Sequence, residues 1–185
     1  MNTKLKELKK VLGEERIKIG EPMSEHTTFK IGGPAQVYIE ISNLDDLAKA
    51  AKVAYKLKIP VFILGGGSNI IVSDGGVKGL VIKNNCRRFE MLSMVGRVAN
   101  TKVDLNQALV FAEAGVVINQ LVRFTLDQGL GGLEYQLGLP GTVGGAVFMN
   151  SNFPKKQAFI GDVVYRAKLI GRNGEIKDVD HSYFH

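Results

Sequence analysis

The chain has 185 residues, 45% of them hydrophobic and 23% charged, which is typical of a folded globular protein and argues against a disordered chain. The formal net charge of +6 leaves a nucleic-acid-binding domain as an alternative, but no aromatic residues accompany the N-terminal lysines, which favours a solvated helix face. The chain has one cysteine and three scattered histidines, which predicts neither a disulfide nor a metal site. It has no apolar run of about 18 residues and no signal-peptide core, which predicts a cytoplasmic protein without a membrane segment. We expect no obligate protein partner.

The first third of the chain has the pattern of a strand, a helix and a second strand. Leucines and Val11 at helical spacing predict an amphipathic helix over 2–13. Alternation predicts a strand over 35–41, and a helix follows over 44–58, with Ser42 as its expected cap. The run VFIL at 61–64 predicts a short, fully buried strand, so we expect a βαβ unit with a parallel sheet.

The rest of the chain predicts a mixed α+β region. Residues 70–83 have the pattern of a strand, a tight turn and a strand, and residues 91–117 contain further strand-like runs, clearest at 108–116. Helical periodicity returns over 118–129. The strand-like runs 163–171 and 175–179 flank an Asn-Gly turn, which predicts a β-hairpin, and we place a subdomain boundary near residue 85.

A first glycine loop, GGGSN at 65–69, follows the short strand 61–64 directly. Consecutive glycines allow neighbouring N–H groups to converge on an anion, and Ser68 and Asn69 add side-chain donors. The loop matches neither a Walker A nor a G-x-G-x-x-G pattern, so anion binding and a ligand-free turn both remain open. If it binds an anion, valine at Gly66 or Gly67 is expected to remove binding and spare the fold.

A second glycine loop, GLPGTVGGA, spans residues 138–146. Its neighbours are apolar enough to bury it, and buried N–H groups need acceptors. A ligand rich in acceptors, such as a pyrophosphate or a flavin ring, would supply them, whereas a turn packed on protein is the alternative. Two such loops, one in each half of the chain, favour a ligand in a cleft between them.

Three ordered blocks resemble one family, the UDP-N-acetylmuramate dehydrogenases, also called UDP-N-acetylenolpyruvoylglucosamine reductases. They are EHTTFKIGGPA at 25–35, IPVFILGGGSNIIVSDGGVKGLVI at 59–82 and GLGGLEYQLGLPGTVGGAVFMN at 129–150. The resemblance runs from about residue 20 to the end of the chain, and the order and spacing of the blocks make it specific.

The resemblance implies an α+β FAD-binding domain of the vanillyl-alcohol-oxidase type, with FAD in a cleft between two α+β subdomains. It implies a helical leader at 1–20, a first subdomain at 21–85, a second at 86–185, and a substrate domain that this chain does not contain. It also implies that NADPH reduces non-covalently bound FAD, which then reduces a UDP-sugar enolpyruvate to UDP-N-acetylmuramate for peptidoglycan synthesis.

The resemblance also implies site residues. FAD contacts are expected from the end of a strand, both glycine loops and a turn between them, at Leu64, Gly65, Gly66, Gly67, Ser68, Asn69, Ala114, Gly115, Leu139, Pro140, Gly141, Thr142, Gly144, Gly145 and Ala146. Arg123 matches the family's catalytic arginine by its spacing from Leu139. A guanidinium there would stabilise negative charge on the substrate carboxylate during hydride addition.

Two features depart from the family pattern. The family's general-acid serine lies in a Tyr-Arg-x-Ser motif, whereas Tyr165-Arg166-Ala167-Lys168 lacks it, so we expect that motif and the catalytic glutamate only beyond residue 185. Residues 151–156, SNFPKK, replace the family's usual Ala-Gly-Ala-Tyr-Gly, which puts substrate contacts from this loop in doubt. Another flavoprotein of the same fold, such as a dehydrogenase flavin subunit, is the alternative within the fold class.

Overall fold

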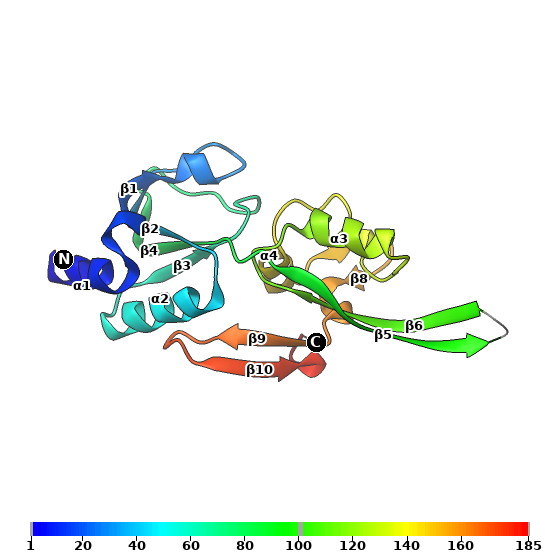
Figure 1. Cartoon of the computed structure of the whole chain (residues 1–185). Helices are drawn as coiled ribbons and strands as arrows, with labels where there is room; N and C mark the ends of the chain where they lie inside the picture. Colours follow the sequence, from blue (N-terminus) through cyan, green and yellow to red (C-terminus); the bar gives the residue numbers. More distant parts are fainter. Residues whose placement is uncertain (1, 100–101, 185) are drawn as a thin grey trace.

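The structure is a computed structural model that describes residues 2–99 and 102–184. Figure 1 shows two parts: helices and a sheet from the first half of the chain, and helices beside a long hairpin from the second half. The helices are α1 (Asn2–Leu12), α2 (Leu44–Lys56), α3 (Ile118–Asp127) and α4 (Val143–Phe148). The strands are β1 (Lys18–Pro22), β2 (Pro34–Ile41), β3 (Val61–Leu64), β4 (Val77–Asn84), β5 (Phe89–Ala99), β6 (Lys102–Ala112), β7 (Asn152–Phe153), β8 (Ala158–Phe159), β9 (Arg166–Ile170) and β10 (Ile176–Asp180).

The predicted βαβ unit and its parallel sheet are confirmed. The first sheet has the order β1-β2-β4-β3, in which β2 and β3 both run parallel to β4 and β1 runs antiparallel to β2. Helix α2 connects β2 to β3, and its cap is Asn43, whose side chain accepts a hydrogen bond from the Asp46 N–H, so the prediction of Ser42 as the cap is wrong by one residue.

The predicted strand–turn–strand over 70–83 is wrong in its first half. Residues 70–72 form no strand, because β4 is parallel to β3 and the chain must return across the sheet before β4 begins. Buried Val72 packs against Gly32 on this return path, and the Gly33 N–H donates to the Ser73 carbonyl at 2.9 Å. The return segment thereby fixes the start of β2.

Strand β3 is also less buried than predicted. It lies at an edge of the sheet, where Val61, Phe62 and Ile63 are exposed and only Leu64 is buried. A continuous apolar run does not distinguish an edge strand from a central one, since strand order depends on pairing between distant segments.

Helix α1 belongs to the same hydrophobic core as the first sheet. Leu8 and Leu12 are buried in one cluster with Ile39, Val53 and Ile82, which come from β2, α2 and β4. The N-terminal helix therefore contributes to the stability of this part of the chain.

The second part is built on an antiparallel pair, β5 and β6; residues 100–101 lie outside the described residues. The predicted helix over 118–129 is confirmed as α3, and the predicted C-terminal hairpin as β9 and β10, although β9 begins at Arg166 rather than at residue 163. Gly174 at the hairpin turn packs closely against Ala48 and Lys52 of α2, so the end of the chain contacts the first part (Figure 1). The subdomain boundary near residue 85 stays a prediction, and the gap between β4 and β5 supports it.

Candidate functional site

The two glycine loops lie against each other, although the residues that bond, Ser68 and Pro140, are 72 positions apart in the sequence. The Ser68 hydroxyl donates to the Pro140 carbonyl at 3.0 Å. A Cβ at Gly65 would lie 2.5 Å from Thr142 Oγ1, and a Cβ at Gly66 would lie 3.0 Å from Gly141 Cα. Glycine is thus required at both positions for the loops to approach this closely.

The first loop, 65–69, presents consecutive backbone donors. Within the described residues, the N–H groups of Gly66, Gly67, Ser68 and Asn69 donate to no protein acceptor. Gly66 and Asn69 are exposed, Ser68 is partly exposed and Gly67 is buried, so the donors at the two ends of the row lie at the surface where a ligand can reach them. Four adjacent N–H groups without a protein acceptor fit an anion with several oxygens, such as a pyrophosphate.

The segment before β2 fixes the shape of this loop. The Thr28 N–H donates to the Gly67 carbonyl at 2.9 Å, and Gly67 has a φ of +71°. A Cβ at Gly67 would collide with the His26 carbonyl oxygen. The expectation that valine at Gly67 would spare the fold is therefore wrong, because the side chain would meet protein backbone before it met a ligand.

The second loop has less need of a ligand than its sequence suggests. Protein acceptors serve the N–H groups of six residues, namely Gly138, Leu139, Val143, Gly144, Gly145 and Ala146. The acceptors include the Ala114 carbonyl, which Gly144 reaches at 2.8 Å. For these six residues the inference that the donors need an external acceptor is therefore wrong; the sequence could not show it because the acceptors of Gly138, Val143 and Gly144 come from α3 and from the turn at 114–116.

The predicted FAD contacts do not all present their side chains to one surface. Leu64 and Ala146 are buried in two separate hydrophobic clusters, and Leu139 packs against the cluster that holds Ala146. Ala114 and Gly115 lie in the turn between β6 and α3, where a Cβ at Gly115 would lie 2.5 Å from the Cys86 carbonyl oxygen. At Leu64, Ala146 and Gly115, only backbone atoms can meet a cofactor.

Arg123 lies on the exposed side of α3, one turn after Asn119. The Asn119 side chain bonds the second loop twice, accepting from the Gly138 N–H at 2.6 Å and donating to the Leu139 carbonyl at 3.3 Å. Residues four apart share one helix face, so Arg123 is on the side of α3 that faces this loop. Its catalytic role stays a prediction.

Sequence reasoning missed Asn119 and Lys83. The Lys83 ammonium, on β4, donates to the Gly65 carbonyl at 2.6 Å, and burial lowers its pKa. The signal that could have found it is its place near the carboxyl end of a parallel strand, where ligands of such sheets bind.

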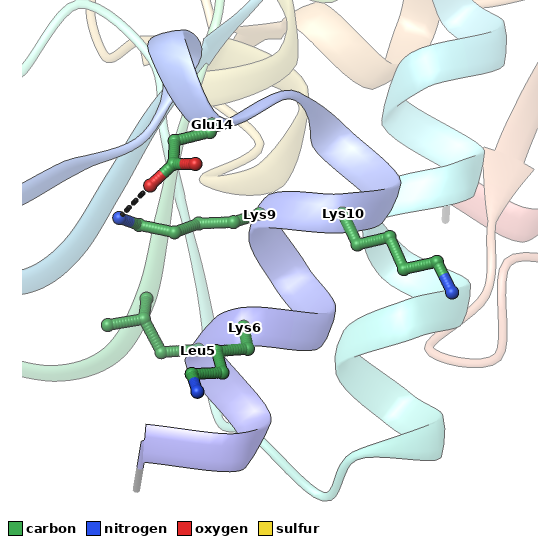
Figure 2. A pocket seen from close by; sticks show the side chains of 5 residues that line it. All are labelled: Leu5, Lys6, Lys9, Lys10 and Glu14. Carbon is green, nitrogen blue, oxygen red and sulfur yellow. Dashed lines mark hydrogen bonds and ion pairs between the residues drawn. The ribbon is translucent and has the colours of Figure 1, made fainter.

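The lysines of α1 do not form a comparable site. Lys6, Lys9 and Lys10 line a hollow of about 450 Å³ together with Leu5 and Glu14. Figure 2 shows the ammonium groups of Lys6, Lys9 and Lys10 pointing in different directions, and Lys9 is already paired with Glu14 at 2.7 Å. This arrangement supports a solvated helix face over an anion site.

Acid precipitation of the FAD-bound protein is expected to release all flavin into the supernatant. Cys86 is 4% exposed, and burial, with a smaller contribution from Glu113, raises the pKa of its thiol to about 11, so the reactive thiolate is scarce at neutral pH. The absorbance of supernatant and pellet checks this result. Flavin retained on the washed pellet would show a covalent bond.

A metal site and a membrane-spanning segment are the other site classes to consider. In the part of the chain that the structure describes, no group of three or more His, Cys, Asp or Glu side chains is placed to hold a metal ion. None of the helices described is long and apolar enough to cross a membrane.

Comparison with known proteins identifies relatives over most of the chain. Residues 34–180 match the FAD binding domain family. A UDP-N-acetylenolpyruvoylglucosamine reductase of Alkaliphilus oremlandii is 38% identical over 175 residues, covering 93% of this chain and 52% of that protein. The enzyme of the same name from Clostridium kluyveri is 36% identical over 169 residues, covering 91% of this chain and 51% of its own length. The chain therefore spans about half the length of the curated relatives it matches.

Solved structures agree. The UDP-N-acetylenolpyruvylglucosamine reductase of Thermus caldophilus has a TM-score of 0.67 at 25% identity, covering 90% of this chain and 52% of that one. A vanillyl-alcohol-oxidase-type flavoprotein of Myceliophthora thermophila also has a TM-score of 0.67, at 11% identity, covering 97% of this chain and 42% of that one, which shows a shared fold. The predicted α+β fold of this type and the resemblance read from the three sequence blocks are confirmed.

Proposed function

The chain belongs to the FAD binding domain family, and on that premise we propose that its two glycine loops hold FAD non-covalently, with the pyrophosphate on residues 65–69. The observation that carries this proposal is the row of four adjacent N–H groups, from Gly66 to Asn69, without a protein acceptor in the described part of the chain. A dianionic pyrophosphate has the oxygens to accept from all of them.

We further propose that the chain is the FAD-binding part of a cytoplasmic oxidoreductase that reduces UDP-N-acetylglucosamine enolpyruvate to UDP-N-acetylmuramate, a peptidoglycan precursor, with NADPH as reductant. The relatives that are 38% and 36% identical carry the name of this reductase, and that name supports the proposal. The UDP-sugar is then the partner of the whole protein, and nucleic acid is not.

FAD, when bound, would supply the hydride that adds to the enolpyruvyl double bond. The chain's own residues would bind and orient. The donors at 66–69 would fix the pyrophosphate, and the Ala114 carbonyl, which accepts from the Gly144 N–H, would hold the second loop in place. Arg123 would stabilise the negative charge that builds on the substrate carboxylate as hydride adds, because an arginine fork matches a carboxylate.

A polypeptide of residues 1–185 is expected to bind FAD without reducing the enolpyruvyl substrate. Its loops suffice for the cofactor, but the resemblance places the general-acid serine and the substrate domain outside these residues, and proton delivery and alignment both depend on them. Titration with FAD, followed by absorbance, measures binding. Mixing the photoreduced protein anaerobically with UDP-N-acetylglucosamine enolpyruvate measures turnover.

Each result has a contrary outcome. A chain that binds no FAD would overturn the proposed function. Rapid reoxidation with formation of UDP-N-acetylmuramate would show that residues 1–185 contain a general acid. Reduction of the oxidised flavin by a phenolic substrate instead would favour another flavoprotein of the same fold.

A further inference from the structure

We infer that Lys83 is a positioning residue for the cofactor's pyrophosphate: by holding the Gly65 carbonyl, it aims the Gly66 N–H at the bound anion. The inference rests on the proposed function and extends it to a residue outside both glycine loops.

The fold places Lys83 directly behind the first loop. Leu64, the last residue of β3, pairs with Lys83 of β4 in parallel register, so the loop leaves the sheet beside the Lys83 side chain. The Lys83 ammonium donates to the Gly65 carbonyl at 2.6 Å. This hydrogen bond is charge-assisted, and such bonds are shorter and stronger than neutral ones.

Peptide geometry transmits this bond to the ligand side of the loop. In a trans peptide the carbonyl and the N–H of the next residue point in opposite directions within one plane. A Gly65 carbonyl directed at Lys83 therefore directs the Gly66 N–H away from Lys83. Glycine at 65 and 66 leaves this peptide free to rotate, so the lysine supplies an orientation that the loop sequence alone does not fix.

The charge of Lys83 is balanced by no ion pair within the described residues, although the charge of Glu40 favours it. The GGGSN loop contains no cation, and among the described residues no carboxylate lies within ion-pair distance of Lys83. Burial lowers the pKa of Lys83; the charge of Glu40 opposes this and that of Arg87 adds to it. A bound pyrophosphate would bring negative charge to the far side of the same peptide and favour the charged lysine.

The test compares Lys83→Met with Lys78→Met, which removes the same charge from the exposed start of the same strand. Titration of each folded protein with FAD, and with riboflavin by competition against FAD, gives two dissociation constants. We expect Lys83→Met to weaken FAD binding by at least about tenfold, the effect of losing a charge-assisted hydrogen bond. We expect riboflavin binding, which involves no phosphate, to change by less than about twofold, and Lys78→Met to change neither.

Lys83→Arg keeps the charge and the donors, so it is expected to restore most of the FAD affinity. The Lys83→Arg variant decides the test if Lys83→Met fails to fold or if riboflavin affinity is too weak to measure. Equal weakening of both flavins by Lys83→Met, unchanged FAD affinity in Lys83→Met, or no restoration in Lys83→Arg would each overturn the inference. A parent protein that binds no FAD would overturn the proposed function as well, so the two failures are distinguishable.

Discussion

Substituting Gly67 by alanine is expected to lower the free energy of unfolding by about 2 to 4 kcal/mol and to abolish FAD binding. Two costs combine. Gly67 has a φ of +71°, where an L side chain is strained, and its Cβ would collide with the His26 carbonyl oxygen. Relief of the collision would move the loop away from residues 26–28 and disperse the row of donors. Urea unfolding followed by circular dichroism measures the stability.

Gly129→Ala is the matched control. Gly129 has the same φ of +71°, but its Cβ would have no atom within 4 Å, so only the strain of the backbone conformation remains. We expect this variant to lose about 1 to 2 kcal/mol and to bind FAD like the parent. An equal loss of stability in both variants would mean that the contact with His26 contributes nothing.

Local signals were sufficient for the longer helices and for the last hairpin of the fold. Helical spacing located α1, α2 and α3, and the Asn-Gly turn located the hairpin of β9 and β10, because each depends on residues near one another in sequence. The place of β4 between β2 and β3 was not readable, since the pairing of β4 with β2 joins residues about 40 positions apart, such as Val37 and Leu80. The same cause made the edge strand β3 look buried.

The candidate site divides along the same line. The clustering of glycine at 65–69 and 138–146 predicted two loops with special backbone requirements, and the structure brings them into contact. The clustering of glycine did not predict which backbone N–H groups lack a protein acceptor. The second loop satisfies six of its donors within the protein, three of them through the turn at 114–116 and Asn119, whereas the first loop leaves four N–H groups open. Such partners are set by tertiary contacts, so only the structure separates the two loops in function.

Substituting Gly66 by valine is expected to weaken FAD binding by more than about a hundredfold while leaving the fold intact. Unlike Gly67, Gly66 does not have a positive φ, and the nearest atoms to its Cβ belong to Gly141 of the facing loop, at 3.0 Å. The added methyl groups would therefore push the two loops apart or occupy the space beside the free N–H groups. Either outcome removes the donors from the pyrophosphate, and neither disturbs the hydrophobic cluster of the first sheet.

Gly75→Val is the control for that variant, because Gly75 lies in the neighbouring return segment with only Ser73 Oγ near its Cβ, at 3.8 Å. It adds the same β-branched side chain where there is room, so FAD binding should stay close to that of the parent. FAD titration and urea unfolding of both variants give affinity and stability together. A Gly66→Val protein that unfolds like the parent and still binds FAD equally well would show that the first loop is only a turn, and the pyrophosphate would have to be placed elsewhere. Loss of stability together with loss of binding would instead show that contact between the loops holds the two parts of the chain together, because the substituted side chain meets only the facing loop.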